Sequence, residues 1–344
     1  SQACTVTLAP NTLSNVWVVQ NSAGDTVTLT AGTGANVVIP NGGIRMVATD
    51  GGGSGAAVTD VLDVLGGTGN VGLGSGAFGT GLTTGTDNVA IGEAAGDALT
   101  SGADNTFVGD NAGGATTTAS NNTAIGYNAM GQAASGRTNT AVGGNVLRIC
   151  TGFDNTSVGY NAAFTLTSGD NNLALGHDAL RSGSPGGNQT TGDNKIGLGD
   201  ENISSFNCQV ALTVASDERD KTDFVDLNLG LDFVKSLEPV TYYWDKRSKY
   251  GDKYADDYDL GAQTPDGTHK EDWMDVGFKA QSVRDLEEAA GYTAAAKKNL
   301  TVSLSEDGKQ YGLQYEKFIP ILVKAIKDQD AIITSLTARI EALE

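Results

Sequence analysis

Alternating apolar and polar residues dominate the first part of the chain. Four runs rich in β-branched residues stand at 16–19, 26–30, 37–39 and 44–47. Between them lie clusters of Gly, Asn, Asp and Pro, which are typical of tight turns. The pattern predicts a small antiparallel β module over residues 1–66, whose strands end at the linker Gly51-Gly52-Gly53.

A short unit, Asn-x-small-apolar-Gly, repeats along the middle of the chain. Six clear copies and two divergent ones end in Gly74, Gly92, Gly109, Gly126, Gly143, Gly159, Gly176 and Gly199. Successive glycines are 18, 17, 17, 17, 16, 17 and 23 residues apart. So regular a period is typical of stacked structural units that cannot bury their apolar faces alone. Residues 67–215 are therefore predicted to form a repeat β-shaft.

The order of residues within each unit predicts which side chains face the interior. We expect the apolar residue before each Gly to point inward, namely Ile91, Val108, Ile125, Val142, Val158 and Leu175. The small residue before it, such as Ala90 or Ala124, then faces the opposite side, because side chains alternate along a strand. The leading Asn is expected in a left-handed conformation or in hydrogen bonds between units, and the corner Gly permits a positive φ.

The position after each Gly varies, which indicates a solvent-exposed position. It holds, in chain order, Glu93, Asp110, Tyr127, Gly144, Tyr160, His177 and Asp200. We therefore expect His177 to be a surface residue rather than a catalytic one. Asp-Asn pairs such as Asp87-Asn88 offer oxygen atoms to cations, but turn capping explains them as well. No metal site and no cofactor is predicted.

After Ser216 the composition shifts to Lys, Asp, Glu, Tyr and Trp, which indicates a separate domain over residues 216–344. Its predicted elements are a short helix at 229–237 stopped by Pro239, a strand at 240–244, a charged insertion at 246–272, a strand turning into a helix at 275–283, and a long final helix after 312–320. This order of elements predicts an α+β domain.

The final helix carries a heptad pattern. Its positions alternate by four and three residues at Leu322, Ile326, Gln329, Ile333, Leu336, Ile340 and Leu343. This spacing predicts a coiled-coil seam over about residues 321–344. Ile and Leu at the two core positions would favour a dimer in an isolated helix. The alternative is a helix docked on its own domain.

Composition and charge argue against several classes of function. The net charge of −19 and the pI near 4.3 argue against nucleic acid as a partner. Three widely spaced cysteines and two histidines support neither a disulfide framework nor a zinc site nor histidine-based catalysis. We expect no signal peptide, because no basic start followed by an apolar run is present, and the longest apolar run, 318–323, is too short to cross a membrane. We expect a soluble chain made in a cytoplasm, without membrane insertion.

A serine and a lysine stand five residues apart where the two compositions meet, at Ser216 and Lys221. A lysine with a neutral amine can take the proton of a serine hydroxyl, and the serine then needs no histidine. A junction that carries both groups suggests a chain that cuts itself there. The same spacing is common in ordinary charged linkers, so the spacing alone leaves both interpretations open.

Four motifs in the C-terminal region carry a resemblance to a known family. They are Ser216-Asp217-x-Arg219-x-Lys221, L-E-P-V-x-Y-x-W at 237–244, G-F-x-A-Q-x-V at 277–283 and L-x-Y-x-x-F-I-P-I-L-V-K-A-I at 313–326. In this order they resemble the intramolecular chaperone domain of phage tailspikes and fibres, the self-cleaving S74 peptidase family. The insertion at 246–272 departs from the compact family pattern.

The resemblance implies a role for each residue of the first motif. Ser216 would be the nucleophile, Lys221 the base, and Ala215–Ser216 the scissile bond. Asp217 and Arg219 would be structural members of the motif. The domain would fold the shaft as a trimer and then cut itself off.

The repeats resemble those of trimeric adhesin heads and phage fibre shafts, in which three chains build a β-roll or an interleaved shaft. We therefore expect a mainly β homotrimer. It would contain a small antiparallel β module, a trimeric repeat β-shaft or β-roll, and an α+β chaperone domain that ends in a coiled-coil helix.

The combined features predict a phage tail fibre or spike subunit in the virion. Its partners would be two further copies, other tail proteins at the N-terminal module, and a host surface receptor. One alternative is a bacterial trimeric surface adhesin, which would need a signal peptide and a membrane anchor. Another is a glycan-cleaving tailspike, which would need paired carboxylates about 5–9 Å apart in a cleft. The acidic residues of the repeats stand singly in turns instead.

Overall fold

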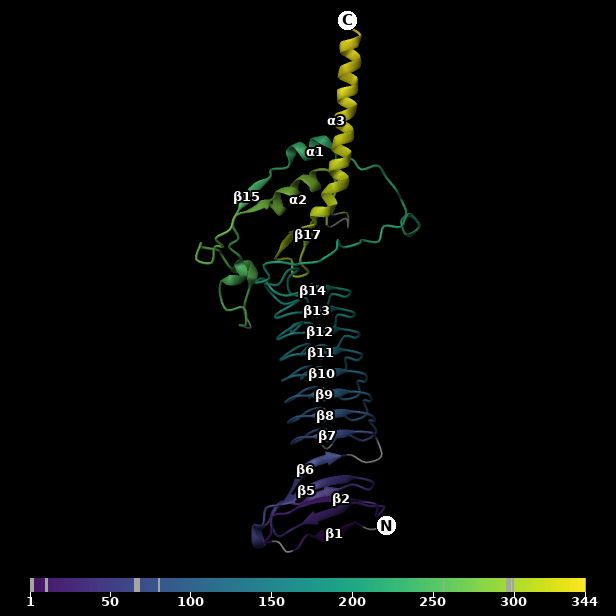
Figure 1. Ribbon diagram of the computed structural model, residues 1–344, viewed down its shortest axis with the longest axis vertical. Coiled ribbons are helices and arrows are strands. Elements are labelled where there is room, and N and C mark those ends of the chain that lie inside the picture. The colour runs from purple at the N-terminus through teal and green to yellow at the C-terminus, as the bar shows by residue number, and fades with distance from the viewer. Residues whose placement is uncertain are drawn as a thin grey trace. The chain divides into compact units, whose positions relative to one another are not determined.

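The computed structural model describes residues 3–9, 12–64, 69–79, 81–255, 257–294, 298 and 300–343, without the side chains of 59–64. Its contacts divide the chain into two compact units, Ser1–Asp200 and Glu201–Glu344. The described part contains one long parallel sheet, several small sheets and a long C-terminal helix. The mainly β fold class is therefore confirmed (Figure 1).

Two three-stranded sheets form the N-terminal module. Their strand orders are β1 (Cys4–Thr7), β3 (Val27–Thr30), β4 (Val37–Ile39) and β2 (Val16–Gln20), β5 (Ile44–Thr49), β6 (Val58–Val64). The pairs are antiparallel as predicted, except that β1 runs parallel to β3. Leu29, Ile39 and Val47 lie in the core of the module.

The glycine run at 51–53 does not end this module. Gly51 and Gly53 adopt φ angles of 71° and 65°, a left-handed conformation that Gly reaches without strain. The chain reverses there and passes through a short 3-10 turn, Gly53–Gly55, into β6. Because β6 pairs with β5, the predicted linker is a turn inside the second sheet.

Eight three-residue strands stack into one parallel sheet, with one strand from each repeat (Figure 1). They are β7 (Val71–Leu73), β8 (Val89–Ile91), β9 (Thr106–Val108), β10 (Thr123–Ile125), β11 (Thr140–Val142), β12 (Thr156–Val158), β13 (Leu173–Leu175) and β14 (Ile196–Leu198). Every strand pairs in register with the next, so that Ala124 lies beside Ala141. Each repeat is one coil of a β-solenoid, stabilised by the rungs on either side.

Left-handed backbone conformations close every rung. The corner glycines have positive φ as predicted, for example 129° at Gly126. A Cβ atom added to Gly126 would lie 2.4 Å from the carbonyl oxygen of Gly143 in the next rung, so no other residue fits. Several other residues of each rung also have a positive φ; before the strand, this residue is not the leading Asn but the one that precedes it, such as Asp104 or Asn121. Asp and Asn tolerate this conformation, which leaves the following Asn free to begin the strand.

The interior of the solenoid is lined by the small strand residues. The central residue of every full strand is buried, at Ala90, Phe107, Ala124, Ala141, Ser157 and Ala174. The expectation that the apolar residue before each Gly points inward is wrong. Ile125 and Val158, for example, remain 39% exposed on the outer face. Larger buried side chains from the rest of each rung, such as Leu99, Met130 and Leu147, pack against these small strand residues and complete the core.

The leading asparagines form a hydrogen-bonded ladder through the solenoid, as predicted. At each step the backbone N–H of one Asn donates to the side-chain oxygen of the previous one, along Asn70, Asn88, Asn105, Asn122, Asn139, Asn155 and Asn172. The Nδ2 group of Asn122 also donates to the carbonyl of Gly136 at 2.8 Å. These amides are buried, so the ladder satisfies polar groups that water cannot reach.

The second unit combines three helices with two small antiparallel sheets. The helices are α1 (Leu231–Ser236), α2 (Ala280–Ala289) and α3 (Phe318–Glu341), and the sheets pair β15 (Val240–Tyr242) with β16 (Asp275–Gly277) and β17 (Val302–Leu304) with β18 (Tyr311–Leu313). The predicted helices and strands are confirmed to within a few residues. The β17–β18 hairpin was not predicted.

Helix α3 uses two different faces. Phe318, Ile321 and Ala325 are buried in the core of their own domain. The apolar heptad residues are exposed in the single chain, with Ile326 at 65%. The helix therefore docks on its domain and still presents the predicted seam. No helix within the described residues is both long and apolar enough to cross a membrane.

Candidate functional site

An exposed segment leads into the predicted cleavage position. The residues from Ile203 to Ala215 form no helix or strand in the single chain. Apolar and polar residues alternate within it, and Val210, Leu212 and Val214 are each more than 75% exposed. This alternation is typical of a strand with one apolar face.

Ser216 and Lys221 lie next to each other at the end of this segment. The Lys221 Nζ atom is 2.5 Å from Ser216 Oγ and 3.2 Å from the Ser216 carbonyl oxygen. Both contacts are exposed to solvent. The structure therefore brings the predicted nucleophile and base within hydrogen-bond distance, and Ala215 immediately precedes them.

Asp217 and Arg219 fix the turn that creates this contact. The Asp217 carboxylate accepts a hydrogen bond from the Arg219 N–H and caps the 3-10 turn Glu218–Asp220. It also forms an ion pair of 2.6 Å with Arg219 Nη2. Hydrogen bonds from the Arg219 side chain and backbone lower the pKa of Asp217, so the carboxylate stays charged. The turn brings Lys221 back toward Ser216.

This arrangement has the parts of a serine-lysine nucleophile. A lysine acts as a base in its neutral form, which burial favours. In the single chain the two groups are in contact while they are exposed to water.

The other C-terminal motifs converge on one small core. Strand β15 from the second motif pairs with β16, which leads into the third. The Tyr315 hydroxyl of the fourth motif accepts a hydrogen bond from the Phe278 N–H at 3.2 Å. The rings of Phe278 and Phe318 stack with centroids 5.4 Å apart. Segments far apart in sequence thus make one packing unit.

A buried carboxylate that the sequence did not reveal anchors this unit. Glu287 is 1% exposed and accepts hydrogen bonds from the Thr301 N–H at 2.8 Å and from the Thr301 hydroxyl at 2.5 Å. These bonds tie α2 to the start of β17. Glu287 follows Val283 by one helical turn, and that spacing was the only sequence signal for its burial.

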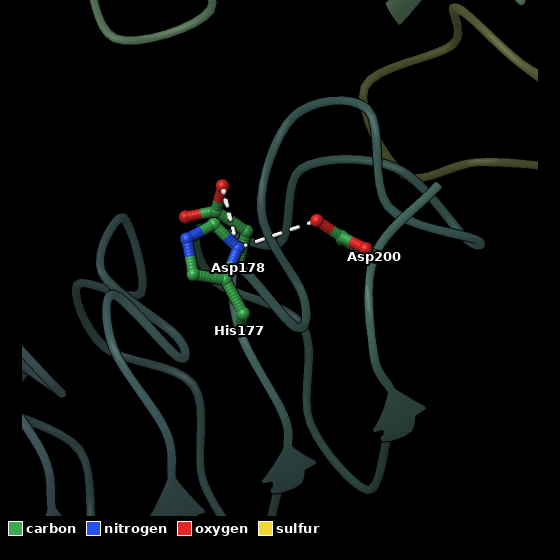
Figure 2. A group of neighbouring side chains, drawn as sticks. All are labelled: His177, Asp178 and Asp200. Atoms are coloured by element: carbon green, nitrogen blue, oxygen red, sulfur yellow. Dashed lines mark hydrogen bonds and ion pairs between the residues drawn. The ribbon is translucent and has the colours of Figure 1, made fainter. Parts of the chain in front are cut away.

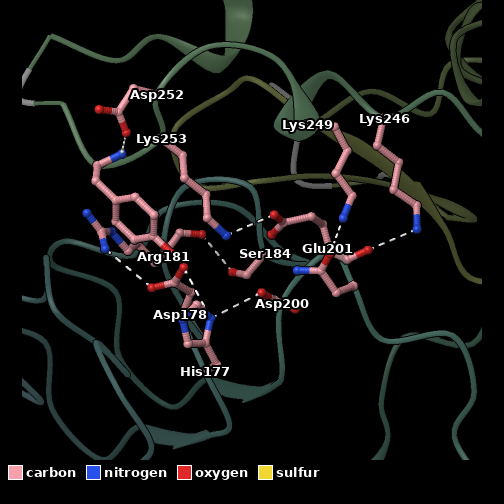
Figure 3. A network of polar contacts seen from close by, with 12 residues as sticks. His177, Asp178, Arg181, Ser184, Asp200, Glu201, Lys246, Lys249, Asp252 and Lys253 are labelled. Atoms are coloured by element: carbon pink, nitrogen blue, oxygen red, sulfur yellow. Dashed lines mark hydrogen bonds and ion pairs between the residues drawn. The ribbon is translucent and has the colours of Figure 1, made fainter. Parts of the chain in front are cut away.

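The insertion at 246–272 is folded rather than extended in its described part. The Asp245 carboxylate accepts hydrogen bonds from the Tyr250 hydroxyl at 2.7 Å and the Gly267 N–H at 2.8 Å. Lys253 forms a 2.9 Å ion pair with the Glu201 carboxylate, and Lys246 Nζ donates a hydrogen bond to the Glu201 carbonyl oxygen at 2.9 Å (Figure 3). A 2.9 Å ion pair between Lys246 and Glu271 joins the two ends of the insertion.

Comparison with known proteins gives one family match. The family model of Peptidase S74, described as chaperone of endosialidase, matches residues 216–292. The match begins at Ser216 and covers less than a quarter of the chain. No curated protein and no solved structure matches the chain. Together with the β-solenoid, the family match fits a phage tail-fibre-like protein.

Proposed function

We propose that this chain is the subunit of a homotrimeric phage tail fibre or spike, and that its C-terminal domain assembles the trimer and then cuts itself off. The observation that carries the proposal is the 2.5 Å contact between Lys221 Nζ and Ser216 Oγ, at the residue where the family match begins. The solenoid is the shaft, and residues 216–344 are the intramolecular chaperone.

The cleavage step uses only groups of the chain and water. Lys221 takes the hydroxyl proton of Ser216 as Oγ attacks the carbonyl carbon of Ala215. The C–N bond breaks as Lys221 gives this proton to the Ser216 nitrogen, which leaves as the free amine, and the Ala215 acyl group is held as an ester on Oγ. Water then hydrolyses the ester to give the Ala215 carboxylate and the free hydroxyl.

Assembly controls this step in the proposal. The pair is exposed in the single chain, and contacts in the trimer would bury it and favour the neutral amine. Cleavage is then a single turnover that reports correct folding. A chaperone of this kind is useful because interchain β pairing is slow and leaves strand edges exposed.

Three apolar surfaces support the trimer. The outer face of the parallel sheet carries a stripe that includes Leu73, Ile91, Ile125, Val158, Leu175 and Leu198. The segment before Ser216 exposes Val210, Leu212 and Val214, and α3 exposes its heptad seam. Exposed apolar surface on this scale is typical of protein interfaces. Two further copies of the chain cover all three surfaces in the proposed assembly.

We also propose a position for this assembly in the virion. The N-terminal module would attach the shaft to other tail proteins, and the solenoid would face the host and its surface receptor. The net charge of −19 is consistent with a particle component that does not bind nucleic acid.

Mass spectrometry of the purified chain tests the proposal. We expect two fragments, residues 1–215 and 216–344, from the wild type. Ser216→Ala and Lys221→Arg should each leave the chain intact, because the first lacks the nucleophile and the second keeps the charge but cannot act as a neutral base. Lys235→Ala, which removes another exposed lysine, is the matched control and should be cut normally. Cleavage that persists in Ser216→Ala would refute the proposed mechanism.

A further inference from the structure

Three metal-binding side chains meet at the last two rungs of the solenoid. His177 and Asp178 follow Gly176, the corner glycine after β13, and Asp200 follows Gly199, the corner glycine after β14. The His177 Nδ1 atom lies 3.4 Å from Asp178 Oδ2 and 3.3 Å from Asp200 Oδ2 (Figure 2). The two carboxylate side chains are only 1% and 7% exposed, whereas His177 is half exposed. The cluster thus combines buried anionic ligands with an accessible imidazole.

We propose that this cluster binds a divalent transition metal ion, with zinc as the preferred ion. A tetrahedral zinc ion with bonds of about 2.0–2.1 Å places its ligand atoms about 3.3 Å apart. Both distances from His177 Nδ1 are close to this separation, and all three ligand atoms lie within 4.8 Å of one another. An imidazole together with carboxylates suits zinc, whereas calcium and magnesium prefer oxygen ligands alone. Three protein ligands leave the fourth position to water.

Neighbouring side chains hold the ligands in place. Arg181 Nη1 lies 3.3 Å from Asp178 Oδ1, so the guanidinium holds the far oxygen while Oδ2 faces the imidazole (Figure 3). The His177 ring stacks on Tyr160 with centroids 5.8 Å apart. Such outer contacts orient the ligands of metal sites before the ion binds.

The cluster departs from the repeat at these positions. The position of His177, directly after the corner glycine, holds Tyr127 and Tyr160 in two earlier rungs. The position of Asp178 holds an asparagine in four earlier rungs, at Asn111, Asn128, Asn145 and Asn161. Asn161 and Asp178 share the same left-handed backbone, with φ of 55° and 53°. A carboxylate thus replaces an amide without a change of backbone.

A metal ion here would join two rungs across their longest connection. His177 and Asp200 are 23 residues apart, whereas most neighbouring rungs repeat after about 17. The sequence placed His177 on the surface and predicted no metal site. The sequence showed that His177 and Asp200 both follow a repeat glycine, but only the fold shows that Asp178 and Asp200 both lie within reach of the His177 imidazole.

Zinc binding to the full chain tests the proposal. An untagged chain with Cys4→Ser and Cys208→Ser removes the exposed thiols, which would otherwise compete for zinc. After treatment with a chelator, calorimetry should give one zinc ion per chain, and zinc should raise the unfolding midpoint by mass action. Cobalt in place of zinc should give the strong visible absorption of a tetrahedral site.

Two variants that copy earlier rungs keep the test independent of folding. His177→Tyr and Asp178→Asn introduce the residues of the preceding repeat, and each should weaken zinc binding at least about tenfold. Asp110→Asn removes an acidic side chain at the position of another rung that is equivalent to His177, and it should leave the affinity for zinc unchanged. A wild type that binds no zinc would overturn the proposal, and so would undiminished affinity in both ligand variants.

Discussion

At the scale of single residues, the narrow solenoid interior couples side-chain sizes between positions. Phe107 occupies a strand centre that is alanine in most rungs. It fits because Gly113 stands where the next rung has Met130, and a Cβ atom at Gly113 would lie 2.5 Å from the Phe107 ring. The large side chain stands on the strand in one rung and in the turn in the next, so the summed side-chain volume of Phe107 and Gly113 is nearly that of Ala124 and Met130.

This exchange predicts a compensating pair of substitutions. Phe107→Ala should lower the free energy of unfolding by about 3–5 kcal/mol, because it leaves a cavity. Gly113→Met alone should also destabilise the chain, through overlap with the Phe107 ring. The double variant recreates the Ala124–Met130 pair of the next rung and should recover most of the loss. Denaturant unfolding measures all four proteins, and additive losses in the double variant would contradict the coupling.

At the scale of elements, the asparagine ladder joins successive rungs alongside the apolar core of the solenoid. The Asn122 N–H donates to the side-chain oxygen of Asn105, and its Nδ2 group donates to the carbonyl of Gly136. The side-chain oxygen of Asn122 in turn accepts a hydrogen bond from the Asn139 N–H. Because these groups are buried, a broken step leaves a donor and an acceptor without water.

We therefore expect Asn122→Ala to weaken the solenoid sharply. The Asn139 N–H and the Gly136 carbonyl lose their partners, at a cost of roughly 1–3 kcal/mol each. Thermal unfolding followed by circular dichroism measures the effect. Gln132→Ala, on the exposed side of the same rung, is the control and should change stability little. Equal midpoints for the two variants would show that the ladder contributes nothing.

At the scale of the whole molecule, exposed apolar surface points to partners. The heptad residues of α3 lie on a different face from Phe318 and Ile321, which the domain itself buries. The seam is therefore available to further copies of the chain without any loss of the intrachain core.

A charge in this seam should dissociate the proposed trimer. In a Ser216→Ala background, light scattering should give about three times the chain mass of 35.2 kDa. Ile333→Asp should shift the chain toward monomer, because a buried charge opposes helix association. Thr334→Asp, one residue away from the seam, should remain a trimer. A monomeric or dimeric parent at micromolar concentration would contradict the assembly, and a trimeric Ile333→Asp would contradict the role of the seam.

The sequence by itself determined the features that depend on local backbone chemistry. The spacing of corner glycines such as Gly126 indicated the rungs, since only Gly fits beside the next rung. The leading asparagines indicated the ladder, and the charged turn at Asp217 and Arg219 kept Ser216 and Lys221 within reach of each other. Each of these signals acts over a few residues or repeats at a fixed period.

The tertiary structure alone decided the features that depend on distances across the fold. The inward face of each strand was predicted wrongly because the pattern does not reveal how close the opposite wall of a rung lies. Phe107 and Gly113, Glu287 and Thr301, and His177 and Asp200 meet only after the chain has wound or packed. Alternation and periodicity specify which side chains share a face, but the width of the enclosed space decides which face becomes the core.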